Sequence, residues 1–83
     1  MGDDLPLVTE FDSSAVERAR YRPDSATLDI WYKGGDRYSY FDVPERAYRE
    51  LRDAPSAGEY VNLRIKPKYR YELEMRRKRF RPR

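Results

Sequence analysis

The clearest alternation of apolar and polar residues predicts a β-hairpin in the first half of the chain. In Thr27–Lys33, apolar residues recur at every second position, which is typical of a strand. Gly34–Gly35 then permits the positive φ angles of a two-residue hairpin turn. The segment 37–43 returns as the next strand, with Tyr38 and Tyr40 on one face.

A weaker strand is predicted ahead of this hairpin. The segment 14–21 has Val16 as its apolar anchor and Ala19 as a small neighbour, but charged residues fill much of the rest. A helical turn is the competing interpretation. The Pro-Asp-Ser sequence in the following segment 22–25 is typical of a turn and favours the strand.

Helical periodicity replaces the strand pattern from Pro44, a residue favoured at the start of a helix. The segment 44–54 places its apolar residues on one helical face. Ser56 and Glu59 have the spacing of a capping box and predict a second, shorter helix to about Ile65. These elements predict an α+β domain in β-β-β-α-α order, a three-stranded antiparallel β-meander packed against two short helices.

The composition supports one small folded domain. Aromatic residues make up 14% of the 83-residue chain, more than disordered chains carry. A chain of this size buries only about 60% of the surface that it exposes when unfolded. Cysteine and histidine are both absent from the sequence. Disulfides, thiolate nucleophiles and Cys-based metal sites are therefore excluded, as is the usual general base.

The charges are distributed unevenly along the chain. Residues 1–67 carry 10 Lys/Arg against 13 Asp/Glu, whereas residues 68–83 carry 8 against 2. This asymmetry indicates a body close to neutral with a basic C-terminal extension. We therefore divide the chain into a mobile leader at 1–12 without regular structure, a domain at 13–71 and an extended basic tail at 72–83.

Neither a signal peptide nor a membrane span is predicted. The acidic start of the chain lacks an apolar run, and no segment approaches the ~20 apolar residues of a membrane helix. We expect a cytoplasmic protein without membrane contact.

No constellation of residues predicts catalysis. Ser13–Ser14 lacks a histidine partner, and the carboxylates are scattered along the chain. Asp3–Asp4 is a poor metal site because metal ions need clustered oxygen ligands. We expect no enzymatic activity, no metal site and no cofactor.

The aromatic residues of the hairpin fall into two pairs. Tyr38 and Tyr40 share the face of the apolar residues in the preceding strand, which favours burial against the helices over base stacking. Trp31 and Phe41 occupy the opposite face. They are either covered by the leader or tail, or exposed for binding.

We predict that this second face and the basic residues bind nucleic acid, specifically RNA. Aromatic and basic residues together are typical of surfaces that bind single-stranded RNA, and dense cationic tails neutralise phosphates. Alternatives are a solvated helix end for the basic run 64–70, a solubilising role or an acidic protein partner for the tail, and protein docking for the aromatic face. The predicted nucleic-acid-binding residues are Trp31, Lys33, Arg37, Phe41, Arg64, Lys66, Lys68, Arg70, Arg76, Arg77, Lys78, Arg79 and Arg81.

The order of several short motifs resembles a known family. Between about Ser13 and Tyr71 the chain contains, in order, SSAV, ARY, LDIWY, YSY, VPERAYREL, APSAGEYVN and IKPKYRY. This order resembles the KTSC domain, named from the C-terminus of some lysyl-tRNA synthetases. The resemblance implies the fold, and the synthetase context suggests RNA binding. Trp31 and the RRKRFRPR extension depart from the family pattern. The matching motif residues are Tyr38, Tyr40, Pro44, Ser56, Gly58, Tyr60 and Asn62.

Overall fold

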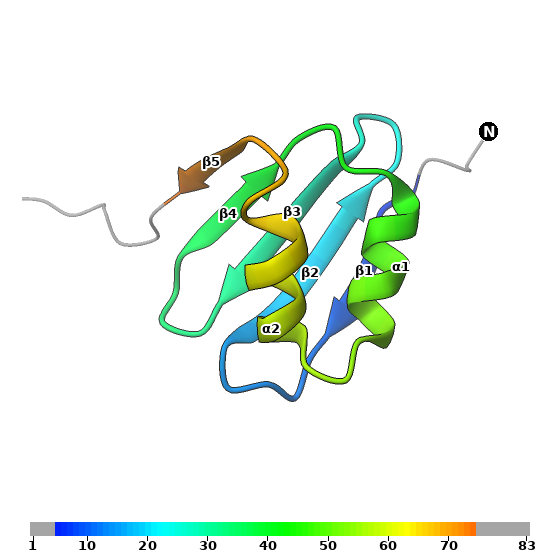
Figure 1. Ribbon diagram of the computed structural model, residues 1–83. Helices are drawn as coiled ribbons and strands as arrows, with labels where there is room; N and C mark the ends of the chain where they lie inside the picture. The colour runs from blue at the N-terminus through cyan, green and yellow to red at the C-terminus, as the bar shows by residue number, and fades with distance from the viewer. Residues whose placement is uncertain (1–4, 75–83) are drawn as a thin grey trace, which may run out of the picture.

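The computed structural model describes residues 5–74, which form a five-stranded antiparallel sheet with helices on one face (Figure 1). The strands lie in the sheet in sequence order, β1-β2-β3-β4-β5. The elements are β1 (Leu7–Glu10), β2 (Val16–Arg22), β3 (Thr27–Tyr32), β4 (Arg37–Tyr40), α1 (Glu45–Asp53), α2 (Ala57–Tyr60), the π-helical turn η1 (Val61–Ile65) and β5 (Tyr71–Glu74).

The predicted α+β class is confirmed, whereas the three-stranded sheet and the β-β-β-α-α order are wrong. The segment 1–12, expected to lack regular structure, contributes β1 at one edge of the sheet. The second additional strand, β5, crosses the predicted boundary between domain and tail and forms the other edge. Both edge strands are four residues long, and backbone pairing with a neighbour holds them more than their own apolar residues do.

A β-bulge in β2 explains why this strand lacks a regular alternation. In its register with β3, Val16 pairs with Tyr32 but Arg18 pairs with Trp31, so β2 has one extra residue. The bulge changes the phase of the strand, and Val16 and Ala19 both become fully buried. The strand interpretation of this segment is confirmed over the helical turn.

The hairpin turn between β3 and β4 is longer than predicted. The Tyr32 N–H donates to the Asp36 carbonyl at 3.0 Å, which leaves Lys33, Gly34 and Gly35 in the loop. The two glycines have φ angles of 103° and 106°, values that side chains disfavour. The glycine pair is therefore required, but in a three-residue loop.

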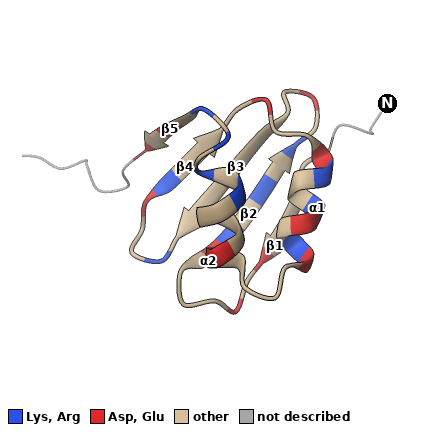
Figure 2. Cartoon of the chain, viewed as in Figure 1, with Lys and Arg blue, Asp and Glu red and all other residues tan. Residues whose placement is uncertain are grey.

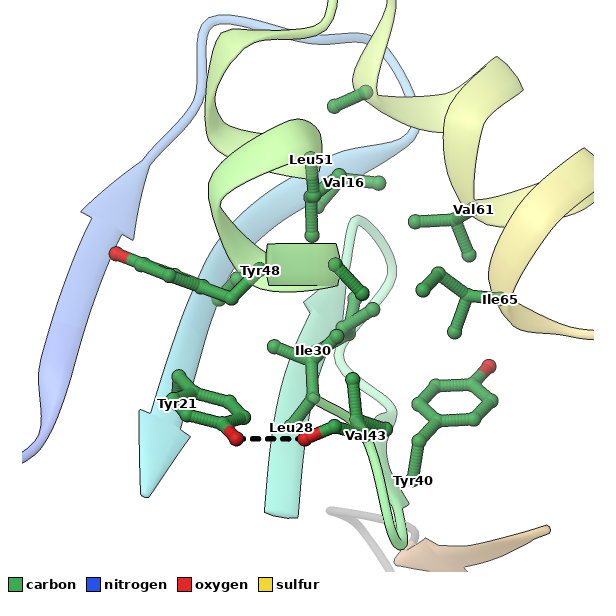
Figure 3. Packing of buried hydrophobic residues seen from close by; sticks show 13 residues of the cluster. Val16, Tyr21, Leu28, Ile30, Tyr40, Val43, Tyr48, Leu51, Val61 and Ile65 are labelled. Carbon is green, nitrogen blue, oxygen red and sulfur yellow. Dashed lines mark hydrogen bonds between the residues drawn. The ribbon is translucent and has the colours of Figure 1, made fainter. Parts of the chain in front are cut away.

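The strand predicted at 37–43 is shortened because the chain bends after Tyr40. Asp42 has a φ of 58°, outside the extended region. Beyond this bend, Val43 is fully buried and its carbonyl accepts a hydrogen bond from the Tyr21 hydroxyl at 2.6 Å (Figure 3). This bond connects β2 to the segment that leads into α1.

The core lies between the sheet and the helices (Figure 3). As the helical periodicity predicts, α1 buries Leu51, and the second helical segment buries Val61 and Ile65. At the edge of the sheet, Thr9 Oγ1 of β1 lies 2.5 Å from the hydroxyl of Tyr48 in α1. This polar contact attaches the first strand to the helical layer.

The prediction that Tyr38 and Tyr40 face the helices is confirmed. Tyr40 is fully buried, and its hydroxyl lies 2.9 Å from that of Tyr32, which satisfies a buried polar group. Tyr38 is half-buried with its ring centroid 6.1 Å from that of Tyr40. Tyr71 of β5 extends this row of rings, 5.2 Å from Tyr38.

The start of α2 is closely packed against the loop before β2. Ser56 Oγ accepts a hydrogen bond from the Glu59 N–H at 3.3 Å, one half of the predicted capping box. An ideal Cβ at Gly58 would lie 2.9 Å from the Ala15 Cβ, closer than carbon atoms pack. Glycine is therefore needed at this position for a close approach.

Replacing Gly58 with alanine should destabilise the fold. Helix propensity alone favours alanine by about 1 kcal/mol, but overpacking a close contact costs about 1–3 kcal/mol. We expect Gly58→Ala to lower the free energy of unfolding measured in urea. Adding Ala15→Gly removes the opposing methyl group and should recover most of the loss. A Gly58→Ala protein that is more stable than the parent would contradict this account.

Candidate nucleic-acid interface

The face of the sheet opposite the helices carries charged side chains around a single tryptophan. Arginines occupy alternate positions of β2 after its bulge, so they point to the same side of the strand. Cross-strand pairing then places them beside residues of β3 and β4, and Figure 2 shows the charged positions along β2. We call this surface the open face, and it comprises Arg18, Arg20, Arg22, Asp29, Trp31, Arg37 and Ser39.

The centre of the open face is a buried carboxylate. Asp29 is fully buried, and its Oδ2 accepts a hydrogen bond from Arg20 Nε at 3.0 Å and forms an ion pair with Arg20 Nη2 at 2.9 Å. Its Oδ1 accepts from Arg22 Nη2 at 3.1 Å and from Ser39 Oγ at 2.6 Å. A carboxylate removed from water in this way requires such partners. Asp29 therefore orients two arginine side chains of β2.

These contacts determine the protonation state of Asp29. Burial alone would raise the pKa of its carboxyl group. The hydrogen bonds from Ser39 and Arg20, and the charge of Arg22, outweigh burial and hold that pKa below its ordinary value. Asp29 is consequently ionised at neutral pH.

Trp31 lies among the arginine side chains of the open face. Its ring is half-buried, and the guanidinium carbons of Arg18, Arg20 and Arg37 lie 5.4, 5.3 and 5.6 Å from its centroid. These distances are within the range of cation–π attraction. The described leader and tail residues pair at the edges of the sheet as β1 and β5. The partial burial of Trp31 is consistent with these flanking arginines.

The edge strands supply acidic partners to the outer arginines. Glu74 of β5 forms an ion pair with Arg37, and Glu10 of β1 lies 3.8 Å from Arg18. Surface pairs of this kind contribute about 0–1 kcal/mol, so an anionic ligand can compete for these two arginines. The open face thus contains a fixed cluster of one carboxylate and two arginines at its centre, and exchangeable ion pairs at its sides.

A hollow of about 300 Å³ extends the open face toward β5. Phe41 lines it together with Arg22 and Arg37, so both predicted aromatic residues, Trp31 and Phe41, contribute to this side of the sheet. Phe41 is half-buried, and the guanidinium carbon of Arg70 lies 5.9 Å from its ring. The structure therefore groups four of the predicted residues: Trp31, Arg37, Phe41 and Arg70.

The other predicted residues are placed elsewhere. Lys66 Nζ lies 5.3 Å from the ring of Tyr32, and Arg64 lines a groove between the helices. Lys33 and Lys68 are exposed in turns. Arg76, Arg77, Lys78, Arg79 and Arg81 lie outside the residues that the structure describes.

Sequence reasoning missed Arg18, Arg20, Arg22 and Asp29. Their charge counts against a strand when composition alone is considered. The available signal was arginine at every second position, because alternation of polar residues is typical of a strand with one solvent-exposed face. A carboxylate in the middle of an apolar strand was a second signal, because it needs charged neighbours.

The family-motif residues in the helical segments shape the helix pair. Pro44 precedes α1, and the Tyr60 hydroxyl donates to Glu50 Oε1 at 2.7 Å, which joins α2 to α1. Burial and this acceptor raise the pKa of Tyr60 to about 12. Asn62 is exposed and makes no side-chain hydrogen bond within residues 5–74. Of these residues, Tyr60 therefore joins the two helices, whereas Asn62 has no hydrogen-bonding role within the described chain.

The described part of the chain contains neither a cluster of metal-binding side chains nor a membrane-spanning helix. Between residues 5 and 74, no three acidic, histidine or cysteine side chains gather to hold a metal ion. No helix in the same range has the length and apolarity to cross a membrane.

Comparison with known proteins identifies relatives of this fold. The family model of the KTSC domain matches residues 12–69. A protein of Tsukamurella paurometabola is 39% identical over 59 residues, which cover 71% of this chain and 88% of that protein. The crystal structure of a KTSC domain protein from Yersinia pestis superposes with a TM-score of 0.78 at 28% identity, over 84% of this chain and 99% of that one.

A third relative is much longer than this chain. A lysine–tRNA ligase of a Nostoc species is 38% identical over 61 residues, or 74% of this chain. The matched segment is only 11% of that ligase. The similarity therefore concerns one small domain of a larger enzyme.

Replacing Asp29 with asparagine should destabilise the protein at neutral pH. The substitution removes the charge that accepts hydrogen bonds from two arginines, and bonds to a charged group contribute about 1.5–3 kcal/mol. We expect a corresponding loss in the free energy of unfolding, measured in urea at pH 7. Asp24→Asn, a change at an exposed turn residue, is the matched control.

The difference in unfolding free energy between the parent and Asp29→Asn should depend on pH. Since the folded pKa of Asp29 lies below its unfolded value of about 3.9, the stabilisation is present above that value. It is lost as the pH falls through the folded pKa. The stability difference between the parent and Asp29→Asn should therefore be constant near neutrality and narrow below about pH 4. A difference that does not change with pH would contradict the ionised network.

Proposed function

This chain belongs to the KTSC domain family, and we propose that it is a small RNA-binding accessory module without catalytic activity. In this proposal, single-stranded RNA contacts the open face and the basic tail in the cytoplasm. The open face supplies stacking, and the tail supplies contacts to phosphates.

The arrangement of Trp31 carries this proposal. Its ring is only half-buried on a sheet face without helices, and three guanidinium groups lie within 5.6 Å of it. Aromatic rings and guanidinium planes are the groups on which unstacked bases bind, and this binding tolerates many sequences. The fixed position of Arg20 on Asp29 lowers the conformational entropy that binding must remove.

The family context supports RNA as the nucleic acid. The Nostoc relatives are named as lysine–tRNA ligases, and a domain like this one is part of each chain. The basic residues at 76–83 add charge that favours a polyanion. Together these features support binding to an RNA backbone without a defined sequence.

A protein partner is the second candidate, and one observation favours it. The open-face arginines are already paired with carboxylates, which makes the surface close to neutral. Tryptophan and arginine are also the residues most enriched at the centres of protein interfaces. The two candidates differ in salt response, because only phosphate binding through several cations weakens steeply with salt.

The test is a titration of a mixed single-stranded RNA pool with four proteins at several salt concentrations. We expect Trp31→Ala to weaken binding by about 1–3 kcal/mol through lost stacking. Leu63→Ala removes an exposed apolar side chain from the helical side and should bind like the parent. A chain ending at Glu74 should show a shallower dependence of affinity on salt.

Fluorescence provides a direct readout because Trp31 is the only tryptophan. Its emission should be quenched as RNA is added to the parent protein. Absence of RNA binding by the full chain, or equal affinity of Trp31→Ala and Leu63→Ala, would reject the RNA-binding open face.

A further inference from the structure

The free edge of β5 presents unpaired backbone groups. The Phe41 N–H donates to the Arg70 carbonyl at 3.0 Å, so the backbone of Arg70 points toward β4. In an antiparallel ladder the direction alternates, and the N–H and C=O groups of Tyr71 and Leu73 therefore point away from the sheet. Tyr69 lies in the bend before β5, where its N–H donates to the Ile65 carbonyl at 3.1 Å.

Apolar side chains are exposed along the same edge. Tyr71 is 56% and Leu73 41% exposed, and both lie on the helical side of the sheet beyond the area that the helices cover (Figure 1). An edge with free backbone groups and apolar side chains is a template for another strand. The charges next to these residues indicate which strand fits.

The charges around Tyr71 have opposite signs on its two sides. Arg70 precedes it and Glu72 follows it, and the next charges outward are Lys68 and Glu74. When two copies of this segment run antiparallel with Tyr71 opposite Tyr71, Arg70 of each copy faces Glu72 of the other. The outer charges also lie opposite their complements, Lys68 against Glu74. Within residues 5–74 of one chain, neither Arg70 nor Glu72 forms an ion pair.

Other symmetric registers lack this complementarity. A register centred on Glu72 places that carboxylate directly against its own copy, which is destabilising. A register centred on Leu73 places Glu72 against Glu74. Only the register centred on Tyr71 pairs every cation of segment 68–74 with an anion. It also places Tyr69 opposite Leu73, so the apolar residues meet on one side.

We propose that two copies of this protein associate through β5, in antiparallel register about a twofold axis at Tyr71. The backbone groups of Tyr71 in the two copies exchange hydrogen bonds, and the Leu73 N–H of each copy donates to the Tyr69 carbonyl of the other. The two sheets become one continuous sheet. This contact is small, so the dimer is weak and its population depends on concentration.

The twofold arrangement has a geometric consequence. An axis perpendicular to the sheet leaves both open faces on the same side. Each Trp31 lies on β3, two strands inward from β5, and is level with Glu74, three residues along the strand from the axis. Five strand spacings of about 4.8 Å across the combined sheet and six residues of about 3.4 Å along it therefore place the two rings about 31 Å apart. The dimer therefore presents two open faces on the same side of one sheet. Formation of the dimer does not depend on a ligand of the open face.

Pairing of β5 with β1 of another copy is the competing arrangement. Both strands are edges of the same sheet, so this head-to-tail contact leaves a free edge at each end. Such contacts produce open-ended assemblies, whereas the β5 pair closes as a dimer. Solution mass distinguishes the two.

The test is sedimentation equilibrium of the full chain without RNA, from micromolar to millimolar concentration. We expect the parent to change from one chain to two and no further. Arg70→Glu or Glu72→Arg alone brings like charges together and should weaken the dimer about tenfold. The double variant Arg70→Glu/Glu72→Arg restores opposite charges and should recover the parent affinity. Arg46→Glu, the same charge change on α1, is the control and should have no effect.

A backbone variant tests the hydrogen bonds separately. Tyr71→Pro removes an N–H that points away from β4, a position where an edge strand tolerates proline. It should leave the circular dichroism spectrum unchanged and the protein monomeric. A parent that stays monomeric up to millimolar concentration, a mass that grows beyond two chains, or a double variant that does not recover would overturn the proposal. Loss of RNA binding in the titration above would leave it intact.

Discussion

The arrangement of the open face depends on one buried carboxylate. Asp29 lies in the central strand and has lost contact with water, so its charge must be balanced by neighbours. Two arginines of β2 and Ser39 of β4 provide that balance, which connects three strands through one side chain. The arginine side chains that make these bonds lie across the strands, and one of them reaches the ring of Trp31. One buried charge thus connects three strands and also positions groups on the exposed surface.

The two faces of the sheet are stabilised by different forces. The helical face is closed by apolar packing and by tyrosine hydroxyls that bond within the core, as between Tyr32 and Tyr40. The open face is stabilised by charge pairs and cation–π contacts, which remain favourable beside water. The bulge in β2 makes this separation possible, because it lets Val16 and Ala19 face the helices while the arginines face outward. A second layer of helices on the opposite face would have to bury these arginines.

Sequence patterns predict the elements whose own side chains determine them. The hairpin and the first helix follow from apolar periodicity and from the glycine pair in the turn, and the second helix follows from the capping-box spacing of Ser56 and Glu59. The edge strands β1 and β5 do not, because neighbouring backbones specify four-residue strands more than their own composition does. The same reason limits prediction of the site. Trp31 and Arg37 follow from alternation in the hairpin, whereas the arginines of β2 join them only through cross-strand pairing after a bulge.

The charge balance of the open face limits what it can recognise. Its outer arginines are neutralised by carboxylates of the edge strands, Glu10 and Glu74, so the surface offers little net attraction to a polyanion. A phosphate must exchange with those carboxylates, and the exchange of one weak surface pair for another contributes little free energy. In the proposed RNA complex, selection by this face therefore depends on stacking at Trp31. The same proposal assigns long-range attraction of RNA to the basic residues of the C-terminal sequence. The proposed function thus divides RNA affinity and the selection of single-stranded RNA between different parts of the chain.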